Sequence, residues 1–245
     1  TKGQLVSFNG GTKDNAIPRE CEASLIYESD EEAAKAEELA CELAETYAEE
    51  LTPAEPDFSC EISCETNRTA EAIPQDAAKE FICAMRLAPN GIQKRNIKMD
   101  GFVVVSLNLG VVRTEEDRIV MIFSPRSSVA SLQEDTKERL NTLAETFGFT
   151  VSHSSEYPGW SFKEDSPVRE ICKESYKELF GEDLKIEAIH AGLECGLFSD
   201  AIKGLDAIAI GPTIANCHTP DEYLTLDSFE RFYEFLKDIL SRLAK

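Results

Sequence analysis

The 245-residue sequence has no long apolar run, few basic residues and only three histidines. No apolar stretch reaches the roughly 18 residues that a membrane-spanning helix needs, and no signal peptide is visible. Acidic residues number 46 against 25 basic ones, which gives a net charge of −21. Because such a surface repels nucleic acids and anionic lipids, we expect neither nucleic acid nor membrane as a partner.

The sequence also has no Cys-x2-Cys pair, although it contains eight cysteines. Irregular cysteine spacing in a chain with enough apolar residues for a core argues against a zinc finger and against a disulfide framework. Cys60 and Cys64 lie in an alternating run, which predicts that both side chains share one face of a strand. Buried free thiols in a reducing compartment are the default, so we predict a cytoplasmic location.

Apolar residues make up 42% of the chain, enough for a packed core in one large domain or two. Their periodicity alternates between helical and strand-like, which is typical of an α/β protein. Ser29 and Ser166 are predicted N-caps. Helices are predicted over 30–51, 75–86, 131–147, 167–180 and 227–243, and strands over 5–8, 22–27, 58–65, 102–109, 117–124, 184–188 and 207–210.

A five-residue segment occurs twice, as Leu43-Ala-Glu-Thr-Tyr47 and as Leu143-Ala-Glu-Thr-Phe147. Each copy follows an asparagine-bearing segment, strands and a helix in the same order. This order predicts two related strand–strand–helix lobes. The polar stretch over 150–165 indicates a domain boundary after them.

The loop Gly211–Glu222 is the strongest candidate for a functional site. An apolar run over 207–210 predicts a buried strand that leads into it, and Pro212 and Pro220 restrict it. A residue at a strand-to-loop junction is well placed for a site in an α/β domain. His218 in this loop is either a ligand or an ordinary loop or core residue, and the loop alone leaves both interpretations open.

Six blocks of the sequence, taken together, resemble the di-zinc peptidases related to aminoacylases and carboxypeptidases, and most closely their aminoacyl-histidine dipeptidase branch. They occur in the order of the family and cover nearly the whole chain. The blocks are Asn9-Gly-Gly-Thr-Lys-Asp-Asn15-Ala-Ile-Pro-Arg-Glu20, Pro89-Asn-Gly91, Ser106-Leu-Asn-Leu-Gly110, Arg126-Ser-Ser128, Ile189-His-Ala-Gly-Leu-Glu-Cys-Gly196 and Gly211-Pro-Thr-Ile-Ala-Asn-Cys-His-Thr-Pro-Asp-Glu222.

The resemblance implies an α/β fold in two parts. Residues 1–155 correspond to an α+β lid with two related lobes of sheet and helix, and residues 156–245 to the C-terminal part of a three-layer zinc-peptidase domain. The family's first metal-ligand motif, His-x-Asp, does not occur in this sequence. The resemblance places that motif and the general-base Glu-Glu pair upstream of the lid, and the Glu-Glu pairs at 31–32, 37–38, 49–50 and 115–116 lie within the residues that correspond to the lid. We therefore expect the C-terminal half of a larger enzyme, without catalytic residues of its own and inactive alone.

The resemblance also assigns site residues. It implies two zinc ions in the intact enzyme, with His218 as the one metal ligand in this chain. It makes Arg126 the clamp for the substrate's carboxylate and Asn15 a substrate hydrogen-bonding residue. Gly192, His190 and Glu194 are further candidates for substrate contact.

Several alternatives stay open from the residues alone. Arg126 is either that clamp or part of a surface salt bridge. Asn15 either binds substrate or serves a turn after two glycines. Asp221 and Glu222 either orient His218 or face water.

The expected activity is metal-dependent hydrolysis of small peptides, of the Xaa-His type, by a homodimer that forms through the lid. A related deacylase of N-acyl amino acids shares the same motifs. A lid-type interaction module without catalytic activity is the other alternative.

Overall fold

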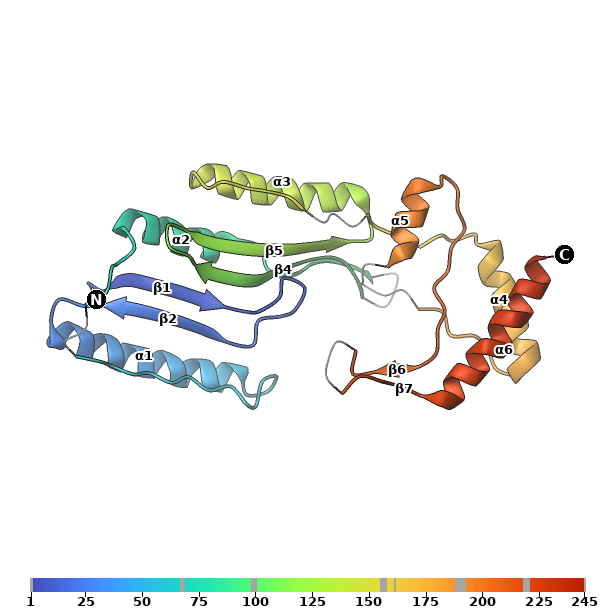
Figure 1. Cartoon of the computed structure of the whole chain (residues 1–245), viewed down its shortest axis with the longest axis horizontal. Coiled ribbons are helices and arrows are strands. Elements are labelled where there is room, and N and C mark those ends of the chain that lie inside the picture. The colour runs from blue at the N-terminus through green and yellow to red at the C-terminus, as the bar shows by residue number, and fades with distance from the viewer. Residues whose placement is uncertain are drawn as a thin grey trace. The chain divides into compact units, whose positions relative to one another are not determined.

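The computed structural model describes residues 2–66, 69–97, 101–154, 158–160, 162–187, 193–217 and 221–244 (Figure 1). The predicted mixture of helices and strands is confirmed. In the described ranges, no helix is long and apolar enough to cross a bilayer. The elements are β1 (Gln4–Gly10), β2 (Cys21–Ile26), α1 (Asp30–Leu51), α2 (Gln75–Leu87), β3 (Gly91–Asn96), β4 (Phe102–Thr114), β5 (Ile119–Ser127), α3 (Ala130–Thr146), α4 (Pro167–Phe180), α5 (Glu194–Ala201), β6 (Ile214–Ala215), β7 (Tyr223–Leu224) and α6 (Leu226–Leu243).

Most of the described strands belong to one sheet, in the order β2-β1-β4-β3, with β5 on β4 (Figure 1). β1 pairs antiparallel with β2, and Gly10 of β1 lies opposite Val112 of β4. The order β1–β2–α1 and the order β4–β5–α3 match the strand–strand–helix order expected from the repeat. That the two lobes are related stays a prediction.

The chain separates into two compact units. The first contains Thr1–Gly91, Leu107–Pro125 and Thr136–Val151, and the second contains Ile92–Ser106, Arg126–Asp135 and Ser152–Lys245. This division crosses β4 and β5, so it follows contacts and not a single break in the sequence. The domain boundary expected near residue 155 stays a prediction.

The core of the first unit forms where α2 packs on β1. Phe81 of α2 is 3% exposed, and its ring meets the ring of Phe8 edge to face at 5.4 Å. Such aromatic pairs stabilise by about 0.5–1.5 kcal/mol beyond the area they bury. The other buried members of this cluster are Leu5, Ala78 and Val112.

Helix α1 begins as predicted, because Ser29 caps it by accepting from the Glu32 N–H. The larger apolar side chains of α1 are more exposed than those of a helix face that packs on a core. Leu39, Leu43 and Tyr47 are 48%, 46% and 51% exposed. The half-buried side chains of α1 include the alanines at 36, 40, 44 and 48, spaced four residues apart. A face of small residues allows close packing and leaves the larger apolar side chains of α1 at its flank.

The second unit has a core between α4 and α6, made of Cys172, Phe235 and Ile239. Burial raises the pKa of the Cys172 thiol to about 11, which keeps it protonated. Ser175 is fully buried, and its hydroxyl donates to Asp238 Oδ2 at 2.6 Å. Arg242 donates to the same oxygen, also at 2.6 Å, so the buried polar groups between the helices are paired.

Three predicted strands are wrong for the residues that the structure describes. Residues 58–65 and 184–187 have no regular structure, and 207–210 is an extended segment without a strand partner. Ile210, predicted as buried, is 36% exposed. A strand needs a neighbour to satisfy its backbone groups, and none of these segments has one among the described residues. The short strands β3, β6 and β7 were not predicted.

Candidate functional site

Asn15 lies in an exposed loop between β1 and β2, in the first unit. The Ala16 N–H donates to Lys13 O at 3.3 Å, which places Asn15 at the third position of a turn. The Gly11 N–H donates to Glu20 O at 3.2 Å and closes the loop at its base. The turn expected for Asn15 is therefore present, and the exposed side chain is free to meet a ligand as well.

Arg126 lies inside β5, whereas the sequence predicted that it would lie just beyond the end of a strand over 117–124. The prediction ended the strand before Pro125, because proline cannot donate to a ladder. β5 pairs with β4 alone in the described sheet, and an edge strand accepts proline. Arg126 is half-buried, and within the described ranges no carboxylate lies within ion-pair distance of its guanidinium. The alternative of a surface salt bridge therefore finds no support among these residues.

The backbone just after Arg126 is held by local hydrogen bonds. The Val129 N–H donates to Ser127 Oγ at 3.0 Å, and this hydroxyl donates to Val129 O at 3.0 Å. The Ser128 N–H donates to Val104 O at 3.3 Å. The turn from β5 into α3 is thus tied down, which fixes the backbone from which the guanidinium extends.

Two glycines bring the end of β5 and the start of α5 to the same short segment, residues 158–160 of the second unit. A Cβ on Gly159 would lie 2.8 Å from Ser127 O, and a Cβ on Gly196 would lie 2.6 Å from Pro158 O. Both distances are too short for any side chain. The segments that contain Arg126 and Glu194 therefore both contact residues 158–160.

Glu194 is the first residue of α5 and is exposed. A carboxylate in the first turn of a helix is favoured by the helix dipole, so its position has a structural reason as well. Gly192 and His190 lie outside the described residues.

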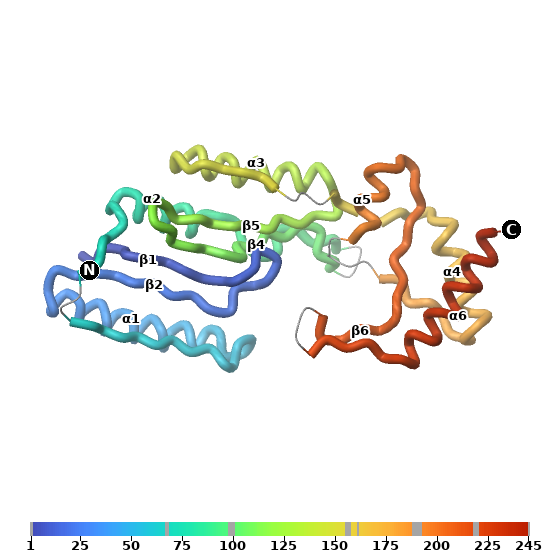
Figure 2. The backbone as a smooth tube through the Cα atoms, in the orientation of Figure 1, coloured from blue at the N-terminus to red at the C-terminus, as the bar shows by residue number. Residues whose placement is uncertain are grey.

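The extended segment over 205–210 links α5 to β6 (Figure 2). The Cys195 thiol donates to Ile208 O at 3.8 Å. Asp206 Oδ2 accepts from the Val168 N–H at 2.9 Å, at the start of α4. Partial burial acts to raise the pKa of Asp206. Hydrogen bonds from Val168 and Ser166 and the positive charges of Lys163 and Arg169 outweigh this effect, so the pKa lies below its usual value. This segment is therefore anchored at its start.

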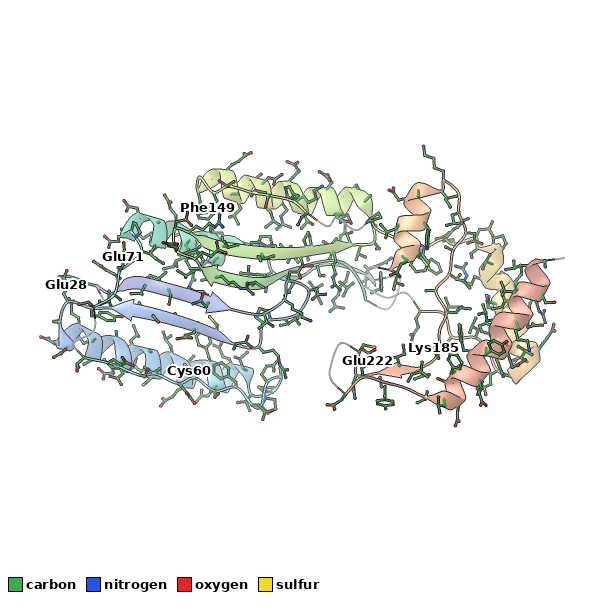
Figure 3. The ribbon with its side chains drawn as sticks, viewed as in Figure 1. Glu28, Cys60, Glu71, Phe149, Lys185 and Glu222 are labelled. Atoms are coloured by element: carbon green, nitrogen blue, oxygen red, sulfur yellow. The ribbon has the colours of Figure 1, made fainter. Side chains whose placement is uncertain are left out.

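The loop that contains His218 connects β6 and β7, which pair antiparallel. Asn216 has a φ of +56° and its side chain donates to Asp221 O at 3.3 Å, so the described flanks of the loop are tied together. Glu222 immediately precedes β7 (Figure 3). His218 itself lies outside the described residues, and its predicted role as a ligand stays a prediction.

No group of three metal-binding side chains occurs in the described ranges. A complete zinc site is therefore not built from these residues alone. Asn108 and Gly159 are positions that the sequence analysis missed: Asn108 donates to two loop carbonyls, and Gly159 leaves room for the backbone at Ser127. Only Asn108 had a signal, because it stands inside one of the resembling blocks.

The chain matches the peptidase family M20/M25/M40 over residues 12–242. It is 32% identical to the cytosol non-specific dipeptidase of Escherichia coli (strain K12) over 244 residues, which are 98% of this chain and 49% of that protein. The crystal structure of aminoacylhistidine dipeptidase from Vibrio alginolyticus matches with a TM-score of 0.81 and 32% identity, over 98% of this chain and 49% of that one.

An aminopeptidase from Bacillus cereus ATCC 10987, 20% identical, matches 69% of this chain and 45% of its own with a TM-score of 0.52, which shows a shared fold. The chain thus spans about half the length of the curated relative and of the solved structures it matches. The family match extends over nearly all of its residues and confirms the family that the six sequence blocks predicted. On this evidence the chain belongs to the peptidase family M20/M25/M40.

Proposed function

We propose that this chain is the C-terminal half of a metal-dependent dipeptidase that cleaves small peptides of the Xaa-His type in the cytoplasm. The observation that carries the proposal is 32% identity over 98% of the chain to a protein named as a dipeptidase. A structure named as an aminoacylhistidine dipeptidase matches with the same coverage and supports the histidine preference.

In this proposal Arg126 binds the C-terminal carboxylate of the dipeptide. A guanidinium fork accepts a carboxylate with two hydrogen bonds, each contributing about 1.5–3 kcal/mol when charge-assisted. A fixed cation at a set distance from the scissile bond measures substrate length, as a dipeptidase requires. Asn15 donates to the substrate from its exposed loop, while Glu194 and His190 recognise its charged ends and Gly192 lets it approach the backbone.

We further propose that the intact enzyme works with two zinc ions. His218 supplies one ligand, and the others come from the part of the relatives' length that this chain does not span. Zinc in such sites polarises a carbonyl and lowers the pKa of bound water. The residues of this chain bind and orient the dipeptide, and the tied flanks of the β6–β7 loop support a fixed ligand position.

The domain assignment, lid over 1–155 and catalytic segment over 156–245, is part of the same proposal. It is supported by apolar side chains of the second segment that stay partly exposed. Ile186 and Ile210 are 42% and 36% exposed, on segments that have no strand partner among the described residues. The exposed apolar side chains of α6 follow one another at spacings of three, four, seven and three residues, as expected for one face of a helix: Leu226, Phe229, Tyr233, Leu240 and Leu243.

A homodimer that forms through the lid is the proposed assembly. The exposed flank of α1, with Leu39, Leu43 and Tyr47, supports it, because contiguous apolar patches of this kind mark interfaces. Light scattering should show a dimer for the parent chain and a monomer for Leu43→Glu. The neighbouring exposed Glu42→Gln should stay dimeric. A dimer with Leu43→Glu would remove α1 from the interface.

The activity is tested with two substrates that share one C-terminal residue. The full-length protein should hydrolyse alanyl-histidine, lose this activity on chelation and regain it with zinc. N-acetylhistidine has the same carboxylate but no free α-amino group, and it should react far more slowly. The chain of 245 residues should be inactive on both. Preference for N-acetylhistidine would favour the deacylase, and no hydrolysis of either by the full-length protein would favour an interaction module.

A further inference from the structure

The side-chain amide of Asn108, in strand β4, forms hydrogen bonds with the loop that contains Asn15. Asn108 Nδ2 donates to Asp14 O and to Ala16 O, both at 2.8 Å. These are the carbonyls of the residues immediately before and after Asn15. An amide NH2 group has two donor hydrogens, so this contact uses both of them.

Two glycines let the loop backbone lie directly on the strand. A Cβ on Gly110 would be 2.4 Å from Asp14 O, and a Cβ on Gly11 would be 1.9 Å from Gly110 O. Gly11 also has a φ of +69°, a conformation that other residues rarely adopt. The loop therefore approaches β4 more closely than any side chain would permit.

The loop's own hydrogen bonds close its base and its turn, and neither of them reaches β4. Those bonds are Gly11 N–H to Glu20 O and Ala16 N–H to Lys13 O. The Asn108 amide and the glycine contacts join the turn to β4. They thus define where the exposed Asn15 side chain is presented.

We propose that Asn108 is a positioning residue that holds the loop so that Asn15 meets the substrate. This inference rests on the proposed function, because it assigns Asn15 to substrate binding. Binding groups must be held within about 0.5 Å, and a displacement of about 1 Å costs on the order of 100-fold in rate. Loss of the Asn108 donors should therefore lower kcat/KM by roughly tenfold to 100-fold.

The first experiment uses this chain and needs no activity. Asn108→Asp keeps the size of the side chain but turns two acceptors toward two carbonyl oxygens. Trypsin should then release peptides that end at Lys13 at least tenfold faster. Asn9→Asp is the control, because Asn9 Oδ1 accepts from the Thr114 N–H at 3.0 Å and a carboxylate can do the same. Equal cleavage of the parent and Asn108→Asp would overturn the proposal.

Asn108→Ser retains one donor and should give an intermediate cleavage rate. It keeps the test decisive if Asn108→Asp does not fold, since cleavage at the parent's rate in a folded Asn108→Ser chain would equally overturn the proposal. Thermal unfolding of each variant identifies those in which the whole chain, and not only the loop, has loosened.

The second experiment is a double-mutant cycle in the full-length enzyme. Asn108→Asp should cost tenfold to 100-fold in kcat/KM by itself and less than twofold in the Asn15→Ala background. Additive losses would show that Asn108 does not act through Asn15, and no loss from Asn15→Ala would also overturn the inference. An unmutated enzyme that hydrolyses no dipeptide contradicts the proposed function instead, whereas the tryptic rates report on the loop in either case.

Discussion

Arg126→Ala in the full-length enzyme should lower kcat/KM for alanyl-histidine by roughly 100-fold to 10,000-fold. Two charge-assisted hydrogen bonds of about 1.5–3 kcal/mol each are lost, and each 1.4 kcal/mol corresponds to a factor of about ten. The half-buried guanidinium at the end of β5 has no ion-pair partner within the described ranges, so the substrate's carboxylate is its expected counterion. Steady-state kinetics on the purified variant measures the loss.

The same variant should differ little from the parent enzyme on alanyl-histidine amide. This substrate has no terminal carboxylate and never engages the guanidinium, so there is little left to lose. Arg126→Lys should recover only part of the activity, because an ammonium lacks the planar fork. Arg113→Ala, an exposed arginine of β4, serves as the matched control and should be neutral. Equal losses on the acid and the amide would make Arg126 a structural residue.

The helices could be predicted from the sequence because their signals are local. Ser29 and Ser166 each accept from the N–H three residues ahead, as an N-cap does, and α1 and α4 begin at the next residue. Gly181 ends α4 in the left-handed conformation with a φ of +71°. Each of these features is decided within a few residues of the chain.

The strands were less predictable because their stability depends on distant partners. The alternating run over 58–65 reads as a strand but finds no neighbour in the described part of the chain. β3 has almost no apolar alternation, yet Gly91–Asn96 forms a strand because β4 lies beside it. Pairing with the long strand β4 also carries β5 past Pro125, whereas the prediction from the sequence ended this strand at residue 124.

Part of the candidate site was likewise visible in the sequence and part was not. Arg126 and Asn15 were named because short blocks of the sequence resemble the family, and their roles stay predictions. The hydrogen bonds from Asn108 to Asp14 O and Ala16 O join residues more than 90 positions apart. The space left by Gly159 beside Ser127 depends equally on the folded backbone. Such contacts have no local pattern, so only the structure identifies them.

His218→Ala in the full-length enzyme should remove bound zinc and activity together, with a loss of more than about 100-fold. Replacing even the groups that orient a ligand typically costs about 10–100-fold, so loss of a ligand itself should cost more. The loop lies between β6 and β7, whose ends are tied by the Asn216 contact to Asp221 O, and both features remain in the variant. Mass spectrometry of bound metal and a dipeptidase assay measure the two effects on one sample.

The fold should survive this substitution, with an unfolding temperature within a few degrees of the parent's. Both units keep their cores, since the two clusters of buried residues in the described part of the chain are built from elements outside the loop between β6 and β7. His153→Ala is the matched control: it removes an exposed imidazole without an assigned role and should leave zinc content and activity unchanged. Full zinc content in an inactive His218→Ala enzyme would instead place the imidazole at the substrate, where it donates to or accepts from the reacting groups without holding a metal.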